Sequence, residues 1–253
     1  MPLCGFFLNE SGKAASEIAN YSPLTAHFYH YSAIIPPMVT ERRYRRIVES
    51  LMRRQPTFEL FLDDVHDGHN LSAILRSFDA VGGLRLFYAR REDKPVKIHK
   101  TIAQGAQHWV RSRRINWQER LDFLQKKRSE GKQIIAARLS ERAKDFRRVD
   151  YTKPTLLIVG NEKEGISPEV AEIADMEAII PMHGMVQSLN VSVATTLILY
   201  EMERQRSAAG MYDTPQLSSE WIEKIAEEIL YRDAIARRSK GAIPARQSLW
   251  LDK

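Results

Sequence analysis

Cysteine is the scarcest residue of this chain, since Cys4 is the single one among 253 residues. An internal disulfide is therefore excluded, and a reducing cytoplasm is the expected compartment. No apolar run is long enough to cross a bilayer, and the first residues lack the basic and apolar segments of a secretory signal. These absences exclude a disulfide-stabilised secreted domain and predict a soluble globular protein without a membrane partner.

Several common functional motifs are also missing or incomplete. The turn GNEKEGIS, residues 160–167, has the spacing of a phosphate loop, but Ile166 stands where that loop needs a lysine, so a nucleoside triphosphatase of this type is excluded. No GxGxxG follows a strand, which argues against a dinucleotide fold. His66 and His69 form an HxxH pair, but no cysteine pair or third nearby histidine completes a metal site, so we expect no metal.

The charge of the chain is unevenly spread. Lysine and arginine number 38 against 32 acidic residues, a net charge of +6. Residues 1–37 hold one basic and two acidic residues and no sustained helical or strand period, so the remainder carries +7 and residues 1–37 are predicted to be an extension. A basic remainder permits a polyanionic partner without requiring one.

A basic helix is predicted directly after this extension. In VTERRYRRIVESLMRRQP, Thr40 is a good N-cap, apolar residues recur at helical spacing, and Pro56 ends the pattern. Six arginines face only Glu41 and Glu49, so the segment is either a solvated charged face or a phosphate-binding surface. The candidate phosphate-binding residues are Arg42, Arg43, Arg45 and Arg46.

From residue 58 onward, short apolar strands alternate with helices. This order predicts an α/β fold with a parallel sheet that helices cover on both faces. Ligands of such sheets bind beyond the carboxyl ends of the strands, where the polar turns after TLLIVG and EAIIPM are expected. Strands are expected at 58–65, 84–89, 133–139, 155–160 and 177–182, and helices at 70–81, 117–131, 167–174 and from 190.

Two helix entrances carry polar residues that allow two interpretations. In the helix after the first strand, Asn70 is a natural N-cap, and Arg76 projects opposite the apolar stripe with Asp79 as a possible i,i+3 partner. At the last long helix, Ser188 and Asn190 precede an apolar run. These residues are either ordinary caps and surface pairs or parts of a binding site.

Three segments resemble, in order, the motifs of the SPOUT methyltransferases: NLSAILRSFDAVGG, LLIVGNEKEGIS and IIPMHGMVQSLNVSVATTLILYEMERQR. Residues 38 to about 213 are most similar to the TrmH family within that superfamily, which methylates the ribose 2'-oxygen of guanosine 18 in tRNA. The similarity includes the basic opening TERRYRRI and the linking segment DFRRVDYTKPT. It covers roughly seven tenths of the chain.

The resemblance implies a fold, a cofactor and partners. The expectations are a deep trefoil knot at the carboxyl end of the sheet, S-adenosylmethionine as methyl donor, tRNA as substrate and a homodimer. The pattern alone would argue against a knot, because chains almost never thread loops. The predicted organisation is an atypical extension over 1–37, a basic helix over 38–57, the SPOUT domain over 58–210 and a basic helical extension over 211–253.

The resemblance also implies roles for single residues. Arg76 is expected to serve the ribose hydroxyl, although an always-charged guanidinium suits phosphate binding better than base catalysis. Asn70 and Glu162 are expected to hold the arrangement together, and Ser188 and Asn190 to fix the cofactor turn. The expected cofactor-binding residues are Ala137, Gly160, Ile180 and Leu189.

The chain departs from the family pattern at two places and leaves the target open. Asp67-Gly68 replaces Lys-Pro between the two histidines, and His183 replaces an aliphatic residue. The three motifs indicate chemistry and not target, so a ribosomal-RNA 2'-O-methyltransferase and an inactive RNA-binding relative remain alternatives.

The end of the chain is predicted to form a helix that packs on the basic helix. It should start near Ser219, with Trp221, Ile225 and Ile229 on one apolar stripe. The basic residues that follow would then join those of the first helix in one cationic surface. They add Arg237 and Arg238 to the candidate RNA-binding residues.

Overall fold

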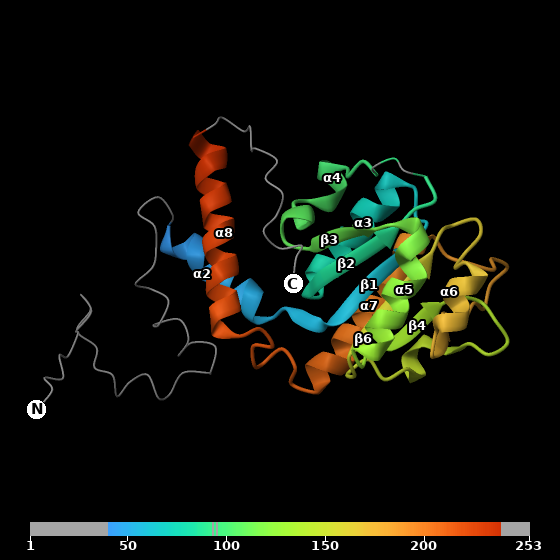
Figure 1. Cartoon of the computed structure of the whole chain (residues 1–253). Helices are drawn as coiled ribbons and strands as arrows, with labels where there is room; N and C mark the ends of the chain where they lie inside the picture. Colours follow the sequence, from blue (N-terminus) through green and yellow to red (C-terminus); the bar gives the residue numbers. More distant parts are fainter. Residues whose placement is uncertain (1–39, 93, 95, 239–253) are drawn as a thin grey trace, which may run out of the picture. The chain divides into compact units, whose positions relative to one another are not determined.

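A computed structural model describes residues 40–92, 94 and 96–238, with side chains described as far as Tyr231 (Figure 1). The predicted extension over 1–37 lies outside the described residues. The described residues divide into two compact units, one comprising Arg54–Tyr212 and the other combining residues 40–53 with residues 213–238. Among the described helices, none is long and apolar enough to cross a membrane.

The larger unit contains, within the described residues, a seven-stranded sheet in the order β3-β2-β1-β6-β4-β7-β5. All neighbouring strands are parallel, as predicted. Every residue of the central strand β6 is buried, as expected for a strand covered on both faces. The strands are β1 (Gln55–Asp63), β2 (Gly83–Ala89), β3 (Arg111–Ile115), β4 (Gln133–Ala137), β5 (Lys144–Asp145), β6 (Thr155–Gly160) and β7 (Met176–Ile179).

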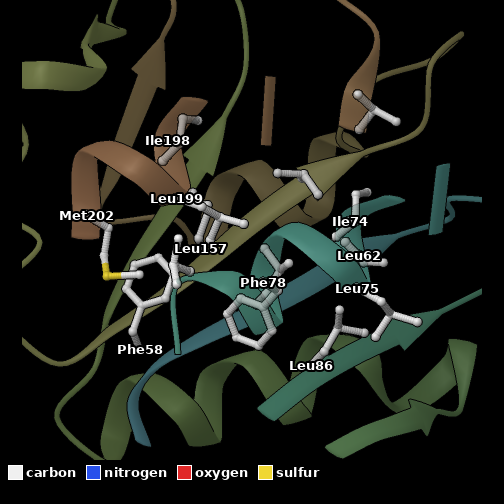
Figure 2. Packing of buried hydrophobic residues seen from close by; sticks show 14 of the residues in the cluster. Phe58, Leu62, Ile74, Leu75, Phe78, Leu86, Leu157, Ile198, Leu199 and Met202 are labelled. Carbon is white, nitrogen blue, oxygen red and sulfur yellow. The ribbon is translucent and has the colours of Figure 1, made fainter. Parts of the chain in front are cut away.

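Helices cover both faces of this sheet. Helices α3 (Gly68–Ala80) and α7 (Val191–Ala208) pack on one face, and α5 (Arg120–Ser129) and α6 (Pro168–Ile173) pack on the other. Figure 2 shows side chains of α3 and α7, such as Phe78 and Met202, meeting side chains of β1, β2 and β6. Along β1, Phe58, Leu60 and Leu62 face this core and Phe61 faces the opposite one, which is the alternation of a strand.

Some elements differ from the predicted ones. The helix expected over 117–131 is a short 3₁₀ turn, η4 (Trp117–Glu119), followed by α5. Strand β3, with the sequence RSRRI, was not predicted because it lacks an apolar alternation. Among the described strands it pairs with β2 alone, at the edge of the sheet, and an edge strand tolerates charged side chains.

Helix α3 begins earlier than predicted, and Asn70 is not its N-cap. The cap is Asp67, whose Oδ1 accepts a hydrogen bond from the backbone N–H of His69 at 2.9 Å. The helix starts at Gly68 because the carboxylate of Asp67, the preceding residue, supplies the capping oxygen. Asn70 therefore lies inside the first turn, and its side chain is available for other contacts.

The possible pairing of Arg76 with Asp79 is not formed either. The Asp79 carboxylate accepts a hydrogen bond from Arg54 Nη2 at 2.6 Å, and Arg54 also donates to the Gly83 carbonyl at 2.7 Å. Arg54 is 2% exposed and lies beyond the end of the basic helix at Met52, so it is not part of a cationic surface. Arg76 is exposed.

In the smaller unit, α2 (Glu41–Met52) and α8 (Ser219–Arg238) pack together, as predicted. Thr40 caps α2, its Oγ1 accepting from the Arg43 N–H at 3.4 Å. The apolar stripe of α8 is rotated from the predicted one, since Trp221 is 39% exposed. The buried residues are Tyr44, Ile47, Val48, Leu51 and Met52 of α2 and Ile222, Ile225, Ala226 and Leu230 of α8.

Candidate functional site

The residues predicted to bind a cofactor lie at the carboxyl ends of three neighbouring strands. Ala137 ends β4 and pairs with Val159 of β6 on one side and Ala178 of β7 on the other. Gly160 ends β6, and Ile180 directly follows β7. The order of the sheet therefore gathers these positions at one edge, where α/β folds bind their ligands.

A chain of hydrogen bonds joins three of the predicted catalytic residues. Asn70 Nδ2 donates to Glu162 Oε1, and Asn190 Nδ2 donates to Asn70 Oδ1 at 3.1 Å. These pairs are separated by 92 and 120 positions in the sequence. The Glu162–Asn70–Asn190 chain thus connects the segments that follow β1, β6 and β7.

Asn190 has a second role as the N-cap of α7. Its Oδ1 accepts from the Ser192 N–H at 2.8 Å and from the Ser192 hydroxyl at 2.6 Å. The cap fixes the rotamer of Asn190 with its amide nitrogen toward Asn70. Asn190 therefore caps the helix, as one interpretation predicted, and the same side chain also extends the hydrogen-bonded chain.

The turn that carries Glu162 is closed by its own residues. Asn161 Oδ1 accepts from the N–H groups of Lys163 at 2.9 Å and Glu164 at 2.7 Å. Two backbone hydrogen bonds of 3.1 Å join Asn161 and Gly165. A Cβ on Gly160 would lie 2.1 Å from the Gly165 carbonyl group, so this turn requires glycine at position 160. Glu162 is held at the tip of a closed turn.

The base of this turn is anchored by a buried carboxylate. Asp63, at the end of β1, accepts from the Ser167 N–H at 2.9 Å, and burial raises the pKa of this carboxyl. Arg120 lies near it, with Nε 3.9 Å from Oδ1, and stacks its guanidinium on Trp117 at 3.7 Å. Sequence reasoning missed Asp63 and Asn161. The acidic end of an apolar strand was the available signal for Asp63.

Arg76 is not brought into contact with the hydrogen-bonded chain. It lies six residues after Asn70 on α3, which is about 9 Å along the helix axis. Its side chain is exposed and makes no hydrogen bond or ion pair with any residue that the structure describes. A guanidinium with five free donors is suited to an oxyanion such as a phosphate.

The turn between β7 and α7 leaves its backbone polar groups open within the described residues. Within the described part of the chain, backbone groups of residues 181–189 take part in no hydrogen bond. Ile180 and Leu189 are half-buried, Ser188 is exposed, and Leu139 beyond β4 is 68% exposed. Open backbone donors and acceptors beside apolar side chains suit an adenine ring, so these residues fit S-adenosylmethionine.

The predicted RNA-binding residues lie in the smaller unit. On α2, Arg42, Arg45 and Arg46 are exposed and Arg43 is half-buried. Arg45 pairs with Glu41 at 3.0 Å. Arg237 and Arg238 end α8, but their side chains lie outside the described ones.

The predicted cationic surface is not continued by the described side chains of α8. From Ser219 to Tyr231 this helix is acidic, so the described cationic face of the helix pair belongs to α2 alone. The charged residues in that stretch are Glu220, Glu223, Glu227 and Glu228 against Lys224.

The two histidines of the HxxH pair have separate partners. His66 Nδ1 lies 3.5 Å from Asp64, and His69 Nδ1 lies 3.2 Å from Asp67. Among the described residues, no group of three or more histidine, cysteine or acidic side chains is arranged to hold a metal ion.

Comparison with known proteins places the chain in a family. Residues 57–200 match the SpoU rRNA Methylase family. A protein of Aquifex aeolicus named tRNA (guanosine(18)-2'-O)-methyltransferase is 48% identical over 205 residues, which cover 80% of this chain and 95% of that protein.

Solved structures agree with this family. The A. aeolicus TrmH/SpoU tRNA modifying enzyme superposes with a TM-score of 0.73 at 49% identity, over 76% of this chain and 97% of that one. An rRNA methyltransferase from Sinorhizobium meliloti with bound AdoMet gives 0.53 at 31% identity, over 62% of this chain and 59% of that one. The chain belongs to the SpoU methylase family.

Proposed function

We propose that this chain transfers a methyl group from S-adenosylmethionine to the ribose 2'-oxygen of guanosine 18 in tRNA. The observation that carries this function is the Glu162–Asn70–Asn190 chain at the carboxyl edge of the sheet, beside a turn with open backbone groups. The name of the A. aeolicus relative, at 48% identity, supports tRNA and guanosine 18 as the target.

The reaction depends mainly on positioning. When bound, S-adenosylmethionine supplies a methyl group on a sulfonium, which is already activated for transfer. Alignment of the reacting groups can supply up to about 7–11 kcal/mol of the barrier. We assign Asn70, Glu162 and Asn190 to hold this alignment, because their side chains are joined to each other and to the cap of α7.

Arg76 is assigned to the substrate phosphate. Its guanidinium stays protonated, so it is a poor base for the ribose hydroxyl. Bound to the phosphate beside the target ribose, it holds the hydroxyl in place, and a phosphate oxygen accepts the departing 2'-proton. The absence of a partner for Arg76 among the described residues leaves its donors available for this contact.

The cofactor is assigned to the carboxyl ends of β4, β6 and β7. Ile180 and Leu189 supply apolar walls, Ala137 and Gly160 are strand-end positions, and Ser188 helps to fix the turn. A deep trefoil knot at this edge is part of the proposal. Its support is the resemblance of the three ordered motifs to those of the SPOUT methyltransferases.

A homodimer is also part of the proposal. Helix α7 exposes Val193 (48%), Leu197 (42%) and Tyr200 (51%) at helical spacing, and a second copy of this surface would cover them. Residues 58–210 would carry the reaction, while 38–57 and 211–253 would bind tRNA. The compartment of this reaction would be the cytoplasm.

Nucleoside mass spectrometry tests the function directly. Unmodified tRNA and ribosomal RNA are incubated separately with the protein and S-adenosylmethionine, and the digests are analysed for 2'-O-methylguanosine. The expected product appears in tRNA and is lost when guanosine 18 is replaced. Methylation of ribosomal RNA alone would favour the second candidate, which the AdoMet-bound S. meliloti rRNA methyltransferase supports. No product in either RNA would overturn the enzymatic function.

A further inference from the structure

A short basic segment is fixed to the first turn of α3, beside the proposed site. It comprises Val96–Lys100, which follows β2 and leads into α4 (Lys100–Ala103). Val96 and Ile98 pack against the main core. The N–H of His99 donates to Ser72 Oγ of α3 at 2.8 Å. This segment, together with His69, is called the basic ledge below.

The attachment of the ledge is close. A Cβ on Gly68 would lie 2.2 Å from the Lys97 carbonyl oxygen, so the ledge occupies the space that a side chain would need. Ser72 Oγ, which accepts from His99, donates in turn to the Gly68 carbonyl at 2.6 Å. The ledge and the start of α3 therefore form one rigid surface, and α3 carries Asn70 and Arg76.

Two imidazole rings of the ledge stack on each other. The centroids of His69 and His99 are 3.9 Å apart, and their planes differ by 21°. The side chain of His69 is 63% exposed, so the pair leaves ring surface open to solvent. His69 directly precedes Asn70 in the first turn of α3, so the ring pair and the Glu162–Asn70–Asn190 chain start from neighbouring backbone positions.

The ledge also carries cations without acidic partners. Lys97 and Lys100 are exposed, and neither makes an ion pair or side-chain hydrogen bond with a residue that the structure describes. By contrast, Lys153 at the amino end of the sheet lies 3.8 Å from Asp150. Two uncompensated cations beside an exposed aromatic pair match a flexible single strand of RNA, which offers phosphates and bases together.

We propose that the basic ledge is a second RNA-contacting surface, which holds the nucleotides flanking the methylated one. Lys97 and Lys100 bind phosphates, and the open ring surface of His69 stacks on a base. This inference rests on the proposed function for the presence of an RNA substrate. It adds residues other than those of α2 and those that align the ribose to the proposed RNA contacts.

The cationic part is tested with the full chain carrying Lys97→Gln and Lys100→Gln. Binding to a tRNA transcript is measured at several salt concentrations, since each lost phosphate contact lowers the salt slope by about 1. The double variant should bind at least about tenfold more weakly at 0.15 M salt, with a slope shallower by about 2.

The matched control carries Lys126→Gln and Lys153→Gln. It removes the same charge from the last turn of α5 and from the segment before β6. Both positions lie toward the amino ends of the strands, whereas the ledge follows the carboxyl end of β2. Its affinity and slope should stay near those of the unmodified protein. Equal losses in both double variants, or no loss in the Lys97/Lys100 variant, would overturn the proposal.

The stacking part is tested by comparing His69→Ala with His69→Phe. Loss of a stacked base should raise the Kd of tRNA at least about fivefold in the alanine variant, and the phenylalanine ring should restore most of it. Equal weakening by both changes would overturn the stacking role. Melting curves with S-adenosylhomocysteine show that each variant keeps its fold and cofactor site.

Failure of this inference is distinguishable from failure of the proposed function. If the unmodified protein methylates tRNA and the ledge variants bind like the control, only the ledge is overturned. If the unmodified protein neither binds nor methylates tRNA, the proposed function fails and the ledge fails with it.

Discussion

The two ends of the parallel sheet treat their polar side chains in opposite ways. At the amino end, Arg206 of α7 is fully buried. Its guanidinium donates four hydrogen bonds, to Tyr151 O at 2.8 Å, Gln55 Oε1 at 3.0 Å, Thr57 Oγ1 at 2.9 Å and Lys153 O at 3.2 Å. By contrast, backbone groups of residues 181–189 at the carboxyl end take part in no hydrogen bond within the described residues, and Arg76 of α3 is exposed and makes no contact of this kind with a described residue.

Buried polar contacts at the amino end stabilise the fold, whereas open polar groups at the carboxyl end are available to a ligand. The acceptors around Arg206 hold β1, the segment before β6 and the end of α7 together, and they include no carboxylate. Desolvation lowers the pKa of Arg206 to about 10, so the fold tolerates an electrostatic cost for this connection. At the other end, the backbone groups of residues 181–189 make no hydrogen bond within the described residues, so they can bind a polar ligand.

The largest expected effect comes from removing the open arginine. Arg76→Ala should reduce methyl transfer to tRNA at least about 1,000-fold, which is about 4 kcal/mol of transition-state stabilisation. The melting temperature and the affinity for S-adenosylhomocysteine should barely change, because Arg76 supports no described contact. Single-turnover kinetics and calorimetry measure these quantities.

The control for this change is Arg113→Ala. Arg113 is exposed on the edge strand β3 and also has no partner among the described residues. It should keep nearly full activity. Retention of more than about a tenth of the activity by the Arg76 variant, a loss under 1.4 kcal/mol, would remove Arg76 from the mechanism.

Breaking the closed end should affect stability instead. Arg206→Met leaves four acceptors without their donor, at about 1 kcal/mol or more each, while relief of the buried charge offsets part of this. The expected loss is about 2–4 kcal/mol, or roughly 4–16 °C in melting temperature.

Arg204→Met is the matched control on the same helix. Arg204 is 65% exposed and, among the described residues, pairs with Glu201 alone, so a loss of about 0.5 kcal/mol or less is expected. Equal losses would contradict the clamp role of Arg206.

The fold was predictable where local pattern and burial agree. Apolar runs marked β1, β2, β4, β6 and β7, and Asn190 was identified as the residue that enters α7. Strand β3 was missed because an edge strand of arginines and serine has no apolar face to detect. The start of α3 was misplaced because both Asp67 and Asn70 are good caps, and only the three-dimensional turn selects between them.

The residues of the candidate site were predicted as a set, but the hydrogen bonds between them were not. The family resemblance supplied Asn70, Glu162 and Asn190, whereas nothing in local sequence indicates that residues 92 and 120 positions apart share hydrogen bonds. Asp79 shows the opposite failure. Helical spacing favoured Arg76 as its partner, but Arg54 reaches it from another segment and leaves Arg76 open.

Ligand linkage gives the next largest effect. S-adenosylhomocysteine at about one hundred times its Kd should stabilise the protein by about 2.7 kcal/mol, because only the folded turn presents the site. For a protein of this size the melting temperature should rise by roughly 5–11 °C. Gly160→Ala should abolish this rise, since a Cβ there collides with the turn at Gly165. No shift at millimolar ligand would contradict the assignment of the cofactor.

The hydrogen-bonded chain predicts that its members act as a unit. Asn70→Ala and Glu162→Ala should each reduce kcat about 50-fold, near 2.3 kcal/mol, and the double variant should lose little more than either one. The reason is that each single change already releases the side chain bonded to it. The double-mutant cycle is measured by single-turnover kinetics. Multiplicative losses near 2,500-fold would mean that the two residues act independently.

The smallest expected effect is a difference between arginines of α2 that have protein partners and arginines that have none among the described residues. Arg42 and Arg46 are exposed and make no contact of this kind with a described residue, whereas Arg45 pairs with Glu41 at 3.0 Å and Arg43 is half-buried and engaged. Arg42→Gln with Arg46→Gln should weaken tRNA binding about tenfold and lower the salt slope by about 2. The matched pair Arg43→Gln with Arg45→Gln removes the same charge but should lower the slope by less than about 1, because cations held by protein partners release fewer counterions.

Titrations of one tRNA at several salt concentrations measure both slopes. Equal slopes for the two pairs would show that net charge, and not the open state of individual arginines, controls the interaction. An unaltered slope after all four changes would place tRNA binding elsewhere on the chain.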